Sequence, residues 1–203
     1  MGSIQVISGE YFRLFAPEQN AYSIEDIAHA LSNICRFTGH TKRFYSVAQH
    51  SVLSSHYEPH DSPFEKLMHD AAEGYLGDIS TPLKRELPYY KQVEGAVEDV
   101  IARRFGLDPD YAHRPSVKKA DIAMLLTEKR DLLPRHHSDH VEWGRYLSLG
   151  IDPCRKKIRC WPQLRAKHEF LFRFYTLCPE SEIVKMPRWV YRFKHWLLSR
   201  ICS

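Results

Sequence analysis

Most of the chain spaces its apolar residues three or four positions apart, which is the pattern of helices with one buried face. This pattern predicts helices that start at Ser23, at Ser46, near Tyr89, at Ser116 and at Pro162. The three serines stand where a helix N-cap is expected, and Gly106 is placed to end the helix that starts near Tyr89. We therefore predict an all-α protein.

Two regions depart from the helical pattern. Residues 4–15 are rich in β-branched and aromatic side chains, which predicts a short N-terminal β-strand or hairpin. Residues 133–161 are polar and contain two prolines and two glycines, which predicts an irregular loop over the surface. We expect one domain over residues 1–178, followed by a basic amphipathic segment over residues 179–203.

The stretch from Ser62 to Lys84 contains a predicted helix that is largely apolar. Ser62 suits the N-cap, Pro63 suits the first helical position, and Glu65 would complete a capping box with Ser62. Glycines and a proline then break the helix and start a loop. The pattern predicts one continuous helix through His69, followed by that loop.

An adjacent histidine and aspartate, His69 and Asp70, interrupt the apolar face of this helix. Burying both groups is costly unless a partner satisfies them. Glu73 follows Asp70 by three positions, so on a helix all three side chains project toward one side. A metal ion is the simplest partner for such a set.

The amino-acid composition and the distribution of charge indicate an ordinary globular protein. The chain has 203 residues, is 43% hydrophobic and 27% charged, and carries a net charge of +4, which suits one ordinary globular domain. Residues 179–203 hold five basic residues against two acidic ones, so the rest is nearly neutral and we expect no nucleic-acid interface. The five cysteines show no CxxC pair, and no apolar run is long enough to span a membrane, so we expect a reduced, cytoplasmic protein.

Further ionisable residues fall on other apolar helix faces. His50 lies in the predicted second helix, and Asp121 takes an inner position in the helix that follows Ser116. Taken singly, each is better explained as a hydrogen-bonded core group or a salt-bridge partner. Two imidazoles and two carboxylates from three helices together favour a mixed nitrogen and oxygen site for Co²⁺, Mn²⁺, Fe²⁺, Ni²⁺ or Zn²⁺.

The order H…HD…D, with H-D-A-A-E-G-Y-L-G-D-I-S-T-P-L-K continuing its second element, resembles the HD-domain metal-dependent phosphohydrolases. The similarity is greatest to their 5′-deoxynucleotidase branch and to related phage and prophage nucleotide phosphohydrolases, including dATP triphosphohydrolases. It extends from about Ile24 to Leu132, over half of the chain. The resemblance implies a helical bundle with the metal held between helices.

The resemblance also implies roles for individual residues. The metal ligands would be His50, His69, Asp70 and Asp121. Glu73 would orient or deprotonate the attacking water, and Asp78 would assist proton transfer near the scissile phosphate. Arg36 and Lys84 would contact phosphate, and Phe37 would contact the nucleoside. This chain has Phe37 where a close branch of the family has tryptophan.

The function expected from this resemblance is hydrolysis of the 5′ phosphate ester of a small-molecule deoxynucleotide, aided by Co²⁺, Mn²⁺ or Zn²⁺, with Mg²⁺ accompanying the substrate phosphates. Monophosphate and triphosphate substrates both fit, and Lys42, Arg43 and Arg85 are candidates for contacts with extra phosphates. We also expect a homo-oligomer. The alternatives are a non-catalytic nucleotide-binding or regulatory HD module, and a protein that a membrane or partner recruits through its basic tail.

The tail itself combines basic residues with an apolar face formed by Trp189, Phe193, Trp196 and Leu197. A helix of this kind lies on a membrane or meets a partner in some proteins. We favour a last helix docked on the body or on a neighbouring subunit, because leaving two tryptophans exposed is unusual.

Overall fold

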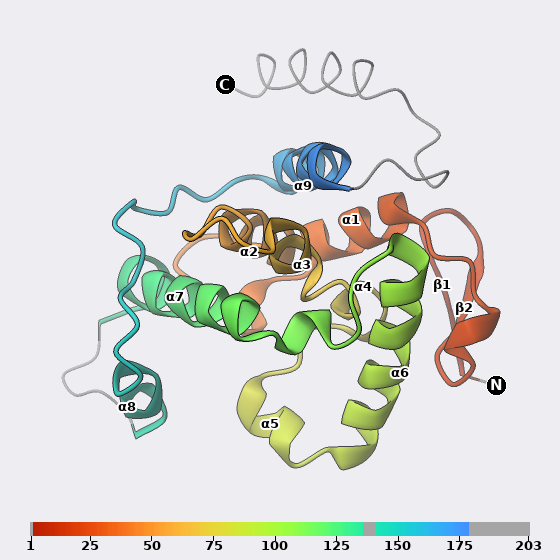
Figure 1. Ribbon diagram of the computed structural model, residues 1–203, viewed down its shortest axis with the longest axis horizontal. Coiled ribbons are helices and arrows are strands. Elements are labelled where there is room, and N and C mark those ends of the chain that lie inside the picture. The colour runs from red at the N-terminus through yellow and green to blue at the C-terminus, as the bar shows by residue number, and fades with distance from the viewer. Residues whose placement is uncertain (1, 136–140, 179–203) are drawn as a thin grey trace.

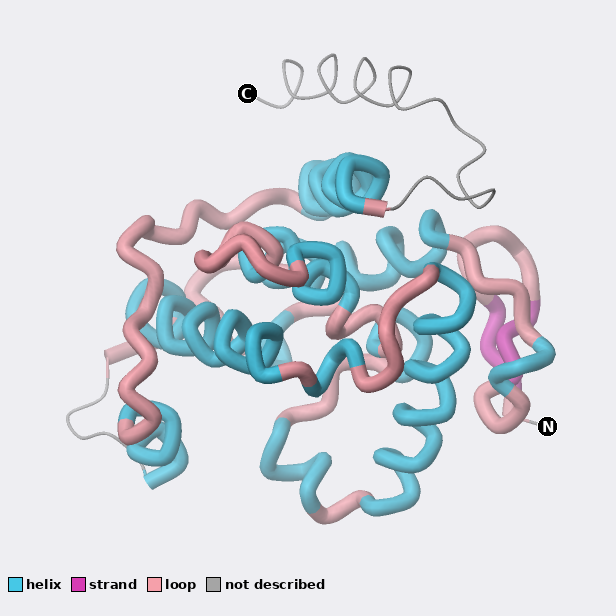
Figure 2. The backbone as a smooth tube through the Cα atoms, viewed as in Figure 1, coloured by secondary structure: helices cyan, strands magenta, loops and turns pink. Residues whose placement is uncertain are grey.

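The computed structural model describes residues 2–135 and 141–178, and most of this chain is helical (Figures 1 and 2). A single antiparallel hairpin, β1 (Ser3–Gln5) and β2 (Tyr11–Arg13), pairs Ile4 with Phe12. Phe12 is buried and stacks on Tyr75 with ring centroids 3.9 Å apart, which attaches the hairpin to the helical body. The predictions of a mainly helical chain and of an N-terminal hairpin are both confirmed.

The helices follow one another closely along the chain. They are α1 (Ile24–Asn33), α2 (Val47–Ser54), α3 (Pro63–Met68), α4 (Glu73–Leu76), α5 (Thr81–Arg85), α6 (Pro88–Phe105), α7 (Pro115–Leu132), α8 (Val141–Leu147) and α9 (Gln163–Leu177). Short 3₁₀ turns, η1 (Pro17–Gln19), η2 (Arg36–Gly39) and η3 (Tyr111–His113), join some of them.

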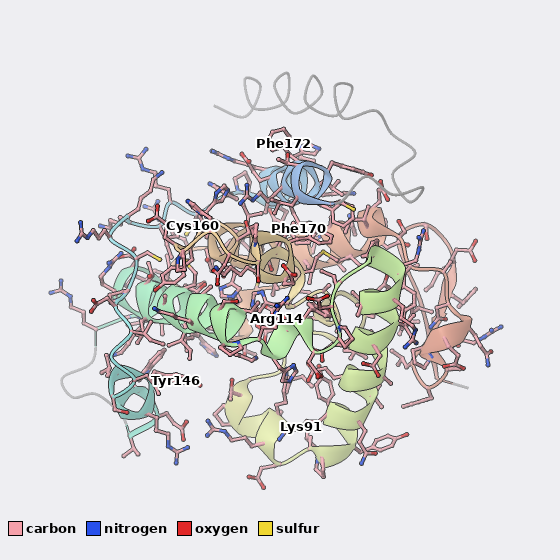
Figure 3. All side chains as sticks on the ribbon, viewed as in Figure 1. Lys91, Arg114, Tyr146, Cys160, Phe170 and Phe172 are labelled. Atoms are coloured by element: carbon pink, nitrogen blue, oxygen red, sulfur yellow. The ribbon has the colours of Figure 1, made fainter. Side chains whose placement is uncertain are left out.

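Helix α2 lies at the centre of the described structure. It packs against α1, α3, α7 and α9, and Figure 1 shows α9 on one side of it and α7 on the other. Phe170 of α9, labelled in Figure 3, is fully buried in the same hydrophobic core as Leu67 of α3 and Ile27 of α1. Polar groups on α2 are therefore enclosed on several sides, which matters for His50.

Side-chain hydrogen bonds cap the start of α2 and connect this helix to the segment that precedes α9. Ser46 caps α2 by accepting a hydrogen bond from the backbone of Gln49. The Gln49 side chain does not return to the cap, as a capping box would require, but bonds the backbone of Arg159 and Trp161. Gln49 thus ties the central helix to the segment that leads into α9.

The stretch from Ser62 to Lys84 differs from its prediction in two ways. Helix α3 ends at Met68, and α4 begins only at Glu73, so the expected continuous helix is wrong. Ser62 does precede Pro63 at the N-cap position, but its backbone is left-handed (φ 49°) and its side chain makes no capping hydrogen bond. Glu65 contacts Arg114 instead, at 3.4 Å, so the expected capping box is wrong as well.

Two further boundaries differ from the sequence prediction. Helix α7 starts at Pro115 with Arg114 as its N-cap, rather than at a Ser116 cap. The region expected to be irregular contains α8, which packs on α7.

The predictions for the basic segment 179–203 lie outside the described residues. No helix in the described chain combines the length and the apolar composition needed to cross a membrane.

Candidate metal centre

Three helical elements bring four predicted ligands to one place. His50 comes from the middle of α2, His69 and Asp70 from the turn after α3, and Asp121 from the second turn of α7. His50 Nε2 lies 3.2 Å from His69 Nε2, 3.3 Å from Asp121 Oδ1 and 3.7 Å from Asp70 Oδ2. One ligand atom from each of His50, His69 and Asp121 lies within 4.8 Å of the others, a spacing that can hold a metal ion.

The hydrogen bonds of the two imidazoles indicate which ring atoms face this point. His69 Nδ1 lies 2.8 Å from the backbone oxygen of Lys66, which can only accept, so Nδ1 donates and Nε2 carries a lone pair. His50 Nδ1 lies 2.6 Å from a carboxylate oxygen of Glu128, which fixes the same tautomer. Such outer partners commonly orient metal-binding histidines.

With both imidazoles neutral, only acceptor atoms face the centre of the cluster. Two imidazole lone pairs face each other at 3.2 Å, and the oxygens of Asp70 and Asp121 lie beside them. Asp70 Oδ2 is buried and has no hydrogen-bond partner among the described residues. Converging acceptors without a donor repel one another unless a cation lies between them, so the side chains fit a divalent metal ion.

The charges around the cluster shift its pKa values as expected for a cation-binding site. Burial and Arg36 both lower the pKa of His50, but the carboxylates of Glu128 and Asp121 outweigh them and raise it to about 9. Burial alone would raise the pKa of Asp121, yet His50 and His69 hold it far below its ordinary value. The carboxylates around His50 therefore favour a positive charge at this point, which either a proton on His50 or a metal ion could supply.

Glu128 is a site residue that the sequence prediction left out. Its side chain is fully buried, with one oxygen on His50 and the other 3.1 Å from Arg36 Nη2. Burial would raise the pKa of this carboxyl, but the charges of Arg36 and His50 lower it. The signal was present in the sequence, since Glu128 lies seven positions after Asp121 and hence on the same face of α7.

Arg36 lies between Glu128 and the predicted ligand Asp70, whose Oδ2 is 3.8 Å from Arg36 Nη1. It opens η2, in which Phe37 and Thr38 both have positive φ, 54° and 53°. Consecutive left-handed residues without glycine are costly, and such strain gathers at functional sites. The prediction that Arg36 and Phe37 belong to the site agrees with this position.

Glu73 lies at the start of α4 rather than, as the sequence predicts, on the same helix as His69. It begins α4 after the turn over residues 69–72, and its carboxyl is buried, with Oε2 lacking a hydrogen-bond partner among the described residues. Burial raises its pKa well above the ordinary value, and the charges of Asp70 and Asp78 raise it further. Glu73 thus takes up a proton more readily than an exposed carboxylate does.

The loop after α4 carries the remaining predicted residues. Its turn needs Gly77, whose φ is 82°, and the hydroxyl of Tyr90 donates to the Gly77 carbonyl at 3.1 Å. Asp78 follows, and burial raises its pKa although Arg36 opposes the shift. Lys84 Nζ forms a 2.7 Å ion pair with Glu94 of α6, so the structure places this lysine against a carboxylate.

A cavity of about 240 Å³ is lined by Arg36 and Asp78, and the four predicted metal ligands do not line it. Phe37 and Thr38 of η2, Leu125 of α7 and the loop from Ile79 to Pro82 also line it. The lining is completed by Glu142, Trp143 and Tyr146 of α8. The sequence prediction missed these last three, although Trp143 and Tyr146 are spaced to share one helix face.

Comparisons with known proteins found relatives but no matching family model. An uncharacterized protein, YfdR, from Escherichia coli strain K12 is 49% identical over 132 residues, which cover 65% of this chain and 73% of YfdR. An uncharacterized protein, RCAP_rcc00048, from Rhodobacter capsulatus is 34% identical over 188 residues, which cover 83% of this chain and 95% of that protein. This extent of identity shows that the chain belongs to the protein family that includes YfdR and RCAP_rcc00048.

Proposed function

We propose that this chain is a metal-dependent phosphohydrolase of the HD-domain superfamily that cleaves the 5′ phosphate ester of deoxynucleotides. The observation that carries the proposal is the convergence of acceptor atoms from His50, His69, Asp70 and Asp121 on one buried point. A purely structural cluster would pair these acceptors with donors. Their arrangement beside a cavity instead suits an ion that must also meet a substrate.

The four ligands would hold Co²⁺, Mn²⁺ or Zn²⁺, with Mg²⁺ accompanying the substrate phosphates, because mixed imidazole and carboxylate sites suit such ions. A bound divalent ion supplies Lewis-acid polarisation of a phosphoryl oxygen and lowers the pKa of the attacking water. Glu128 and the Lys66 carbonyl keep both imidazoles in the tautomer that binds metal through Nε2.

Two carboxyl groups, the buried Glu73 and the partly buried Asp78, would carry out the proton transfers. As the water oxygen attacks phosphorus, Glu73 accepts the proton that the water loses. As the bond between phosphorus and O5′ breaks, Asp78 donates a proton to O5′, so the deoxynucleoside leaves as a neutral alcohol. Burial raises the pKa of both groups, which makes the Glu73 carboxylate a stronger proton acceptor and helps Asp78 to keep the proton that it donates.

Arg36 is the group that would neutralise charge on the phosphoryl oxygens. Its guanidinium is nearly buried, and Nε has no hydrogen-bond partner among the described residues although Nη1 and Nη2 face carboxylates. A phosphate oxygen is the acceptor that such a planar fork binds best. Cleavage of the same bond releases phosphate from a monophosphate and triphosphate from a triphosphate.

The test is a product assay on all nucleoside and deoxynucleoside mono-, di- and triphosphates with Co²⁺, Mn²⁺, Mg²⁺ or Zn²⁺. We expect a free deoxynucleoside together with phosphate or triphosphate. No product with any of these metals would favour the non-catalytic nucleotide-binding module.

Two variants test the assigned roles. His69→Ala should lose both metal binding and hydrolysis, whereas Glu73→Gln should bind metal but hydrolyse slowly. His60→Ala is the matched control, because this imidazole is largely exposed and pairs with Glu58. Full activity of His69→Ala would show that the metal centre is assigned wrongly.

A further inference from the structure

Helix α8 forms one wall of the cavity that Arg36 also lines. Trp143 and Tyr146 lie on the same face of this short helix, and both line the cavity, as does Phe37 on η2. Figure 3 shows Tyr146 on α8 below α7. The lining thus combines a cationic group, Arg36, and a carboxyl group, Asp78, with the aromatic rings of α8.

Contacts with two neighbouring helices hold α8 in this position. Glu142 forms a salt bridge with Arg85 of α5, with oxygens 3.1 and 3.3 Å from Nη1. Lys129 Nζ of α7 lies 5.2 Å from the centroid of the Trp143 ring, in a cation–π contact. The aromatic wall is therefore attached to α5 and α7, which both contribute residues to the cavity lining.

The chemistry of the lining indicates the kind of group that would occupy this end. Aromatic rings bind flat π-systems by stacking, and the hydroxyl groups of Thr38, Ser80 and Thr81 on the lining can bond the edge of such a ring. Pockets that enclose a whole drug-sized ligand measure roughly 300–1,000 Å³. A volume of about 240 Å³ therefore suits one ring system with its sugar.

We propose that α8 is the base-binding wall of the substrate site, with Trp143 and Tyr146 stacking on or against the nucleobase of a deoxynucleoside. The inference rests on the proposed function for the direction of the substrate, with phosphate at Arg36 and base at α8. It adds the residues that set affinity for the nucleoside, in a region whose sequence pattern predicts only an irregular loop.

The experiment measures binding of the four deoxynucleosides, which carry no phosphate, to the full-length protein by isothermal titration calorimetry. Trp143→Ala and Tyr146→Ala should each weaken binding roughly 5- to 150-fold, the equivalent of about 1–3 kcal/mol of stacking at 1.4 kcal/mol per tenfold change. Trp143→Phe keeps a ring and should bind within a few-fold of the wild type. Tyr89→Ala is the matched control, because this exposed tyrosine stacks on Phe15, which follows β2 and does not line the cavity.

Binding unchanged within twofold in both alanine variants would overturn the inference, as would a lack of deoxynucleoside binding by the wild type at millimolar concentrations. Nucleoside binding needs neither metal nor turnover, so its loss in Trp143→Ala supports the base wall even if no nucleotide is hydrolysed. Where nucleotides are hydrolysed, the variants should raise KM for them. Hydrolysis with an unaltered KM would leave the phosphohydrolase proposal standing and refute the base wall.

Discussion

Replacing Glu128 by glutamine tests the metal centre through a residue that is not itself a ligand. One Glu128 oxygen accepts from His50 Nδ1 at 2.6 Å and the other from Arg36 Nη2 at 3.1 Å. Glutamine has nearly the same shape but only one acceptor oxygen, so its amide group must face one of these two donors. The change weakens the orientation of His50 and removes a buried charge beside Arg36.

Loss of an outer partner of a metal-binding histidine typically reduces metal affinity or activity by about 10- to 100-fold, or roughly 1.4–2.7 kcal/mol. We expect Glu128→Gln to weaken Mn²⁺ or Co²⁺ binding by this amount, measured by isothermal titration calorimetry on protein whose folding has been checked by urea denaturation. Glu65→Gln is the matched control, since Glu65 contacts Arg114 rather than the imidazole. A dissociation constant within twofold of the wild-type value would refute the assigned role of Glu128.

Three further outcomes follow from the structure. Adding Mn²⁺ at one hundred times its dissociation constant should stabilise the folded protein by about 2.7 kcal/mol, and chelation or His69→Ala should remove the shift in a thermal melt. Burial and the charge of Glu94 raise the pKa of Glu98 from 4.5 to about 7, so between these pH values the folded state keeps a proton that the unfolded state loses, and the unfolding free energy falls as pH rises. In urea denaturation, the stability of Glu98→Gln relative to the wild type should therefore increase from pH 5 to pH 8. An equal stability difference at both pH values would contradict this. Lys66→Met should lower the unfolding free energy by roughly 1–3 kcal/mol, because the buried Lys66 Nζ donates hydrogen bonds to the carbonyl oxygens of Tyr57 and Pro59. An unchanged urea midpoint would show that these hydrogen bonds contribute little to stability.

The interpretation of the Ser62–Lys84 stretch shows where sequence reasoning reaches its limit. It identified His69, Asp70 and Glu73 as neighbours, but through one continuous helix, whereas the chain turns between Met68 and Glu73. A helix and a run of tight turns place residues three or four positions apart at similar distances. The correct grouping therefore follows from local spacing even though the assumed backbone is wrong.

Lys84 and α8 show the opposite situation. Whether Lys84 faces a phosphate or a carboxylate depends on Glu94, which belongs to the next helix, α6. Whether the segment around Trp143 forms a helix against a cavity depends on contacts with α5 and α7. Gly144 and the nearby glycines and prolines weaken the local helical signal, so these tertiary contacts decide the outcome.

Local patterns in the sequence specify the helices with strong apolar periodicity and clear ends, such as α1, α6 and α9, because periodicity and capping act within a few turns of chain. They also indicate which ionisable residues occupy inward positions. The contact between Glu128 and His50, which are 78 positions apart, and the contribution of α8 to the cavity lined by Arg36 depend on the packed fold. Such pairings depend on the packing of whole helices, whose free energy is set by surfaces distant in sequence rather than by any local pattern.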